Sequence, residues 1–121
     1  MALTFLDTNI LLRHLLADHP QQSPQATAYL SRVERGELQV RVSELVIFET
    51  VFTLQRSYKR PKDKIRDALL ALLGLPGIIR PGKRRFQKVF DLYVSLNISF
   101  ADAYLTVLME QLGLDEIATF D

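Results

Sequence analysis

The chain has 121 residues, of which 48% are hydrophobic and 24% are charged, and its formal net charge is +1. This length and apolar content suit one compact domain with a real core and argue against disorder. The sequence has no cysteine, which excludes disulfides, thiolate metal sites and a cysteine nucleophile. Its most apolar uncharged stretch, 68–79, is too short and too rich in glycine and proline to span a membrane. The first residues carry no secretory signal, so we expect a cytoplasmic protein.

The pattern of apolar residues predicts alternating strands and helices. Leu3–Leu6 is a short β-prone run that stops at Asp7, and Asn9–Ala17 carries apolar residues at helical spacing. Ser23 followed by Pro24 is typical of an N-cap and the first turn of a second helix.

The middle of the sequence continues this order. Gln39–Val42 alternates as a half-buried strand does. Ser43 is expected to cap a helix that runs to about Tyr58, is apolar nearly all round and should therefore be buried. A further helix opens at Pro61 and closes at Gly74.

The last third adds two strands and two helices. Gly77–Arg80 is a strand and Gly82–Leu96 a helix, Ser99 caps a final helix to Gln111, and Glu116–Phe120 is a fourth strand. The aromatic residues of these later helices fall at core spacing. The whole order predicts an α/β fold with a mainly parallel central sheet of about four to five strands, covered by helices on both faces.

Basic residues are concentrated in one segment. Between Arg56 and Lys88 lie 11 of the 15 basic residues and only two acids, so this segment carries +9 and the remainder of the chain −8. Phosphate contacts by Lys and Arg supply most non-specific affinity for nucleic acids, although solvated helix faces give the same pattern. We expect a basic surface for a polyanion, to which these residues contribute: Arg56, Lys59, Arg60, Arg84 and Arg85.

Two aspartates follow predicted strands. Asp7 follows the first strand and Asp121 the fourth, and ligands of an open α/β sheet gather beyond the carboxyl ends of its strands. If the two strands are neighbours, about 4.8 Å apart, one cation can reach both carboxylates. Capping of the following helix also explains Asp7, which could play both parts.

Two further acids lie on predicted helices. Glu49 projects from a mainly apolar helix face, and a buried ionised carboxylate is costly unless it is paired or binds a metal. An ion pair with Arg13 or Arg41 is the structural alternative. Asp102 lies three residues after Ser99, which matches a capping box, but it also precedes the last strand and so lies at the same end of the sheet.

Four clustered carboxylates repel one another unless cations hold them together. Oxygen ligands without His or Cys suit Mg²⁺ or Mn²⁺ rather than zinc. Two such ions could activate a water molecule and stabilise the leaving oxygen of a phosphodiester displacement. The only histidines, His14 and His19, are expected to be structural or surface residues.

Four motifs lie in a fixed order along the whole chain. They are Leu6-Asp7-Thr8-Asn9, Glu49, Phe100-Ala101-Asp102-Ala103 and Thr119-Phe120-Asp121. Together with the alternation of strands and helices, they resemble the PIN-domain family, and most closely its toxin ribonucleases of the VapC type. The resemblance implies a metal-dependent endoribonuclease that cuts RNA, a homodimer, and a small antitoxin partner whose tail covers the site. It implies Mg²⁺ or Mn²⁺ ligands at Asp7, Glu49, Asp102 and Asp121, with supporting polar contacts from Thr8, Asn9 and Thr119.

Two other functions fit parts of the sequence. The chain could be a catalytically inactive PIN-fold module that binds RNA or protein, or a Mg²⁺ phosphatase, although Asn9 replaces the second acid of the Asp-x-Asp motif expected there. Proteins similar to this one continue past the Thr-Phe-Asp motif into a last loop and strand, whereas this sequence ends at Asp121. We therefore expect a single domain over residues 1–121 that lacks that loop and strand.

Overall fold

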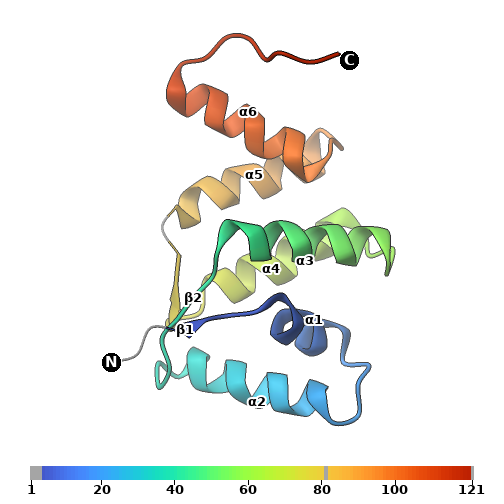
Figure 1. The fold of residues 1–121 in the computed structure, drawn as a ribbon, viewed down its shortest axis with the longest axis vertical. Helices are drawn as coiled ribbons and strands as arrows, with labels where there is room; N and C mark the ends of the chain where they lie inside the picture. The colour runs from blue at the N-terminus through green and yellow to red at the C-terminus, as the bar shows by residue number, and fades with distance from the viewer. Residues whose placement is uncertain (1–3, 81, 121) are drawn as a thin grey trace.

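The structure, a computed structural model, describes residues 4–80 and 82–120. Over these residues, short strands alternate with helices (Figure 1) in the order β1 (Thr4–Phe5), α1 (Thr8–Leu16), α2 (Gln22–Glu34), β2 (Val40–Arg41), α3 (Glu44–Arg56), α4 (Lys62–Leu73), β3 (Ile78–Ile79), α5 (Lys83–Ser95) and α6 (Phe100–Leu112). The predicted helices and the first three predicted strands are confirmed, with ends that shift by one or two residues.

The three strands form one small parallel sheet in the order β1-β2-β3. Val40 is the register partner of both Thr4 and Ile78, and the ladder continues where the Leu6 amide donates to the Arg41 carbonyl at 2.8 Å. The predicted parallel sheet flanked by helices is therefore confirmed, and the carboxyl ends of all its strands lie at one edge.

The predicted fourth strand, and with it a sheet of four to five strands, is wrong for the residues that the structure describes. Glu116–Phe120 has no regular structure and is exposed. Helix α6 ends at Gly113, whose left-handed backbone (φ 68°) turns the chain beyond α6, to the side of the molecule away from β1 (Figure 1). A β-prone run becomes a strand only when it reaches a sheet edge, and this one does not.

Local capping explains where the helices begin. The Ser43 hydroxyl accepts a hydrogen bond from the Val46 amide (3.2 Å), as predicted for the start of α3. The prediction for Ser23 is wrong, because α2 begins at Gln22, two residues before Pro24, and its N-cap is Gln21. The Ser23 hydroxyl instead accepts from the His19 amide (3.1 Å). Pro24 still falls in the first turn, where a missing amide proton costs no helical hydrogen bond.

Gly77 allows β3 to pass close to the end of α2. Its amide donates to the Val33 carbonyl at 3.1 Å. A Cβ atom at this position would lie 2.1 Å from the Leu38 carbonyl oxygen and 2.7 Å from that of Val33. Both neighbours are backbone atoms that cannot turn away, so glycine is required here.

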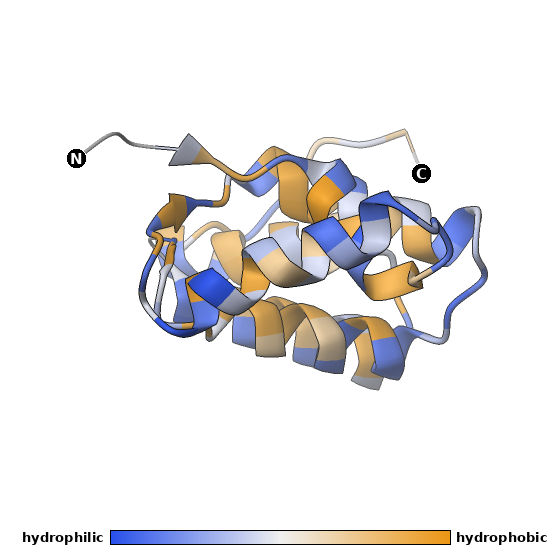
Figure 2. Ribbon diagram, turned by 90° about the horizontal axis from the view of Figure 1, so that it is seen from below, coloured by the Kyte–Doolittle hydropathy of each residue, from blue (hydrophilic) through white to orange (hydrophobic). Residues whose placement is uncertain are grey.

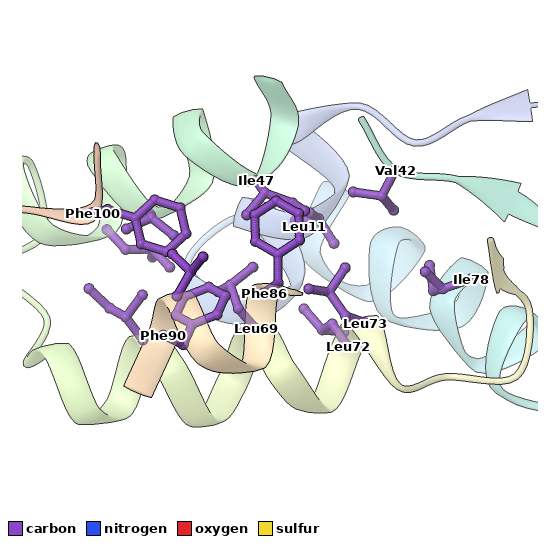
Figure 3. Close-up of a cluster of buried hydrophobic side chains, with 14 of the residues drawn as sticks. Leu11, Val42, Ile47, Leu69, Leu72, Leu73, Ile78, Phe86, Phe90 and Phe100 are labelled. Atoms are coloured by element: carbon purple, nitrogen blue, oxygen red, sulfur yellow. The ribbon is translucent and has the colours of Figure 1, made fainter. Parts of the chain in front are cut away.

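One apolar core joins the helices to the sheet. Apolar and polar residues alternate along the helices (Figure 2). Side chains from α1, α3, α4, α5 and α6 converge around Phe86 and Phe90 (Figure 3). The predicted packing role of the later aromatic residues is confirmed, since Phe86, Phe90 and Tyr93 are fully buried. Phe100 joins them, with ring centroids 4.8 Å from Phe90 and 5.5 Å from Tyr93.

Burial of Tyr93 predicts a loss of stability at alkaline pH. Its hydroxyl donates to Oε1 of Gln55, and burial raises the pKa of Tyr93 from 10.0 to about 12. The folded protein holds this proton more tightly than the unfolded chain, so the stabilisation is complete below pH 10 and is lost as the pH rises through 12. We expect the free energy of unfolding to fall by up to about 3 kcal/mol over this range, as measured by urea titrations at stepped pH. Tyr93→Phe should remove this part of the decline, and an unchanged pH profile in that variant would contradict the assignment.

Candidate active site

Asp7 lies beyond the carboxyl end of β1, as predicted. It occupies the N-cap position of α1 with an extended backbone (φ −86°, ψ 151°), but its side chain makes no capping hydrogen bond. The cap is made by the backbone alone, through the Ile10 amide and the Asp7 carbonyl at 3.1 Å. Capping therefore leaves the exposed carboxylate available for a ligand.

Thr8 connects this helix start to Glu49, 41 residues away along the chain. The hydroxyl of Thr8 is nearly buried and donates to Oε2 of Glu49 at 3.0 Å. This bond fixes one oxygen of the Glu49 carboxylate and joins α1 to α3. The supporting role predicted for Thr8 thus has a contact in the structure, whereas Asn9, also predicted, is exposed on the first turn of α1.

The expected burial of Glu49 is wrong. Helix α3 buries one face, made by Ile47, Thr50, Val51 and Leu54, and leaves Glu49 exposed. The helix looks apolar all round in sequence because part of its apolar surface, including Leu45 and Phe52, also faces outward.

The alternative ion pair of Glu49 is also wrong. Arg13 pairs with Asp18 at 3.6 Å, and neither Arg13 nor Arg41 pairs with Glu49. Within residues 4–80 and 82–120, none of Asp7, Glu49 and Asp102 has an ion-pair partner. These carboxylates are therefore not neutralised by a guanidinium or an ammonium group of the described chain.

Asp102 lies in the first turn of α6. Its amide donates to the Ser99 hydroxyl at 3.1 Å, which confirms the Ser99 cap, and its carbonyl accepts from Thr106 at 2.8 Å. Its exposed carboxylate lies at the positive end of the helix dipole, which favours a negative charge.

Three of the four predicted acids, Asp7, Glu49 and Asp102, lie among the described residues, and these three do not form one metal-binding group. Asp7 and Glu49 belong to elements that Thr8 ties together, but no group of three or more acidic or histidine side chains there could hold a metal ion. In Figure 1, helix α1 packs below α3, and α6 packs above it. The ring of Phe48 on α3 packs against Phe100 of α6, with 4.9 Å between the ring centroids. Glu49, the next residue after Phe48, points about 100° away from it around the helix axis.

The last motif is only partly visible. Asp121 lies outside the described residues, and Thr119 belongs to the exposed segment after α6. The oxygen-only chemistry of the acids fits Mg²⁺ or Mn²⁺, but the described arrangement does not by itself close a site around an ion.

The predicted basic surface is divided. Arg56, Lys59 and Arg60 lie at the end of α3 and just after it, and all are exposed. Arg84 and Arg85 lie at the start of α5, beside the sheet and at the opposite end of the helical layer (Figure 1). Residues close in sequence separated because α4 and β3 carry the chain back across the molecule between them.

A polar network around Glu44 was not predicted. Its carboxylate accepts from Arg80 Nη2 and Tyr104 Oη, both at 2.7 Å, and lies 3.8 Å from Arg85 Nη1. Arg85 also donates to Gln111 Oε1 at 2.9 Å. Burial, together with the bond to Glu44, raises the pKa of Tyr104. Arg85 was predicted to contact RNA, but its guanidinium contacts Glu44 and Gln111 of the protein itself.

Comparison with known protein families shows which family this chain belongs to. The profile described as "PIN domain" matches residues 4–121. This chain belongs to the PIN-domain family. The family predicted from the four motifs is therefore confirmed over nearly the whole chain, and PIN domains are generally metal-dependent nucleases.

One further comparison and one property of the helices complete the description of this PIN domain. A search of curated proteins found no match. Within the described part of the chain, no helix is both long enough and apolar enough to cross a membrane.

Proposed function

We propose that this PIN domain is a Mg²⁺- or Mn²⁺-dependent endoribonuclease of the VapC type, the toxin of a toxin–antitoxin pair. The observation that supports it best is the family match over residues 4–121, combined with motif acids that are exposed and have no ion-pair partner in the described chain. No ion pair within the described chain explains why a carboxylate stands at each of these three motif positions. Ligand binding gives them a role.

Each motif residue has a place in this proposal. The residues proposed to hold the ions are Asp7, Glu49, Asp102 and Asp121. Thr8 orients Glu49 through the hydroxyl–carboxylate bond, and Asn9 and Thr119 are proposed as supporting polar residues. Bound ions would supply an activated water and would stabilise the leaving oxygen of the phosphodiester. Arg56, Lys59, Arg60 and Arg84 are proposed to hold RNA phosphates, because each is exposed.

A second candidate is a PIN-fold module that binds RNA or protein without catalysis. The specific observation in its favour is that the described acids do not form a group of three. An enzyme and such a module give different results in one assay.

The assay uses the purified chain and a labelled single-stranded RNA with Mg²⁺, with Mn²⁺, or with a chelator in excess. The nuclease proposal expects internal cleavage with either ion and none with the chelator. Salt-sensitive binding without turnover at saturating Mn²⁺ supports the inactive module. Hydrolysis of a small phosphoester but not of RNA contradicts both.

Divalent ions should stabilise the fold if the acids share a site. A ligand that binds only the folded state raises its stability by about 2.7 kcal/mol when present at 100 times its Kd. We therefore expect the unfolding midpoint to rise with Mn²⁺ concentration in a thermal melt, and the rise to shrink in Asp7→Asn. If Asp102→Asn shrinks it equally, the two carboxylates share the ion. No shift over a wide concentration range would contradict a common site.

The homodimer, the small antitoxin and the cytoplasmic location belong to the same proposal and are supported by the family resemblance alone. Sedimentation of the purified chain tests the dimer. A chain that sediments as a monomer at micromolar concentration would contradict it.

A further inference from the structure

A cleft of about 390 Å³ lies between the second half of α3 and the first turn of α6. Small-molecule sites commonly have volumes of roughly 300–1,000 Å³. Phe52, Gln55 and Arg56 line it from α3, and Ser99 and Ala101 line it from the start of α6. No acid lines this cleft among the described residues, although Asp102 follows Ala101 directly in the sequence.

The cleft offers a flat stacking surface. The side chain of Phe52 is 59% exposed, whereas Phe86, Phe90 and Tyr93 are fully buried in the core. The guanidinium of Arg56 lies over it, 5.1 Å from the ring centroid. Unpaired nucleobases are bound in proteins by stacking on aromatic rings and on arginine planes. An exposed phenylalanine beside an arginine presents both kinds of surface.

The polar groups of the cleft suit a nucleotide rather than a purely apolar ligand. Gln55 is held by the hydroxyl of Tyr93 through its Oε1, so its amide nitrogen can donate to a base edge. Lys59 and Arg56 are exposed at the rim. Their positive charges complement the phosphate of a nucleotide whose base lies inside.

A second protein surface is a less suitable occupant. A stable protein interface buries about 800 Å² on each partner, and charged residues are depleted at its core. This cleft is small, and cations stand at its edge.

We propose that the cleft between α3 and α6 binds one unpaired nucleobase of single-stranded RNA, stacked on Phe52 and Arg56, with Lys59 contacting its phosphate. The inference rests on the proposed function for the identity of the substrate. It adds that recognition is by base stacking beside the α6 acid, so that single strands bind better than duplexes.

The test measures binding and not cleavage. A labelled single-stranded RNA, the same RNA as a duplex, and an abasic ribose–phosphate oligomer of equal length are titrated by fluorescence anisotropy with a chelator present. We expect Phe52→Ala to weaken binding of the single strand by about 5- to 150-fold and to leave the abasic oligomer unaffected. Phe52→Trp should bind as the parent does. Lys59→Ala should weaken both ligands and lower the salt dependence.

Leu45→Ala is the matched control. Leu45 lies two turns before Phe52 on the same side of α3, is 66% exposed and does not line the cleft. Its replacement should change none of the three affinities. Circular dichroism of the three alanine variants tests whether each of them folds.

The outcomes separate this inference from the nuclease proposal. Equal losses on the single strand and the abasic oligomer, or no loss in Phe52→Ala, would overturn it. So would a Phe52→Ala variant that loses its dimer in sedimentation but keeps its RNA affinity, because a second copy would then cover the face. Base-dependent binding by a chain that cuts no RNA with Mn²⁺ upholds the inference while the nuclease proposal fails. Normal RNA cleavage together with base-independent binding upholds the nuclease proposal, while the base-stacking inference fails.

Discussion

Replacement of Asp7 by asparagine is expected to lower the rate of RNA cleavage by roughly a hundredfold or more, the size found for single groups that stabilise transition-state charge. Aspartate and asparagine have the same shape, so the substitution removes the negative charge and leaves the side-chain volume unchanged. The fold should survive, because the Asp7 carboxylate is exposed and caps α1 with its backbone only. Initial rates at saturating Mn²⁺ measure the first effect, and the thermal midpoint without metal measures the second.

The control for this variant is Asp91→Asn on α5. Asp91 is an exposed acid outside the four motifs, so its replacement should leave the rate within a factor of about two of the parent, the range of a neutral surface change. If Asp7→Asn cuts RNA as fast as Asp91→Asn, the proposed role of Asp7 is wrong. If both variants lose activity together, the effect comes from total charge and not from the motif.

The largest loss of stability is expected from Phe100→Ala. The ring of Phe100 is 6% exposed, and it lies 4.9 Å from Phe48 and 4.8 Å from Phe90, between centroids. Truncation of a buried phenylalanine costs about 3–5 kcal/mol, against a total stability of about 5–15 kcal/mol for a domain. Urea unfolding of the variant should therefore show a much lower midpoint.

Phe120→Ala is the matched substitution at an exposed site. Phe120 is fully exposed in the segment after α6, and a surface change of this kind should alter stability by no more than about 0.5 kcal/mol. A large cost at Phe120 would show that this segment packs against the domain in solution. A small cost at Phe100 would contradict the aromatic cluster.

Helices whose ends are marked by residues at or next to those ends were predicted correctly. Ser43 and Ser99 announce the starts of α3 and α6 because a serine hydroxyl bonds to an amide three residues later. Pro61 and Gly74 mark the limits of α4 for similar short-range reasons. The order of strands and helices then fixes a parallel sheet, because crossover connections allow little else.

The errors concern contacts between residues distant in sequence. The β-prone run Glu116–Phe120 needs an edge to pair with, and no local pattern shows that the chain turns away at Gly113. Glu49 was expected to be buried because most of its neighbours on the helix are apolar, yet only the packing of α3 decides which apolar side faces inward.

The polar network of Glu44 depends in the same way on distant partners. Arg80 is 36 residues away and Tyr104 is 60 residues away. The sequence offered one weak signal for Glu44, its place in the first turn of a helix, where acids are common for dipole reasons alone.

The way the helices pair has a consequence for how the protein refolds. The most extensive packing joins helices that are consecutive in the chain, α5 with α6 and α1 with α2. Such helical hairpins form rapidly, because closing a short loop costs little entropy. The bond from Thr8 to Glu49 spans 41 residues, so it must wait until α1 has docked on α3. We therefore expect the helices to form before the motif residues meet during refolding. A substitution at Thr8 should then mainly speed unfolding and leave the rate of folding nearly constant.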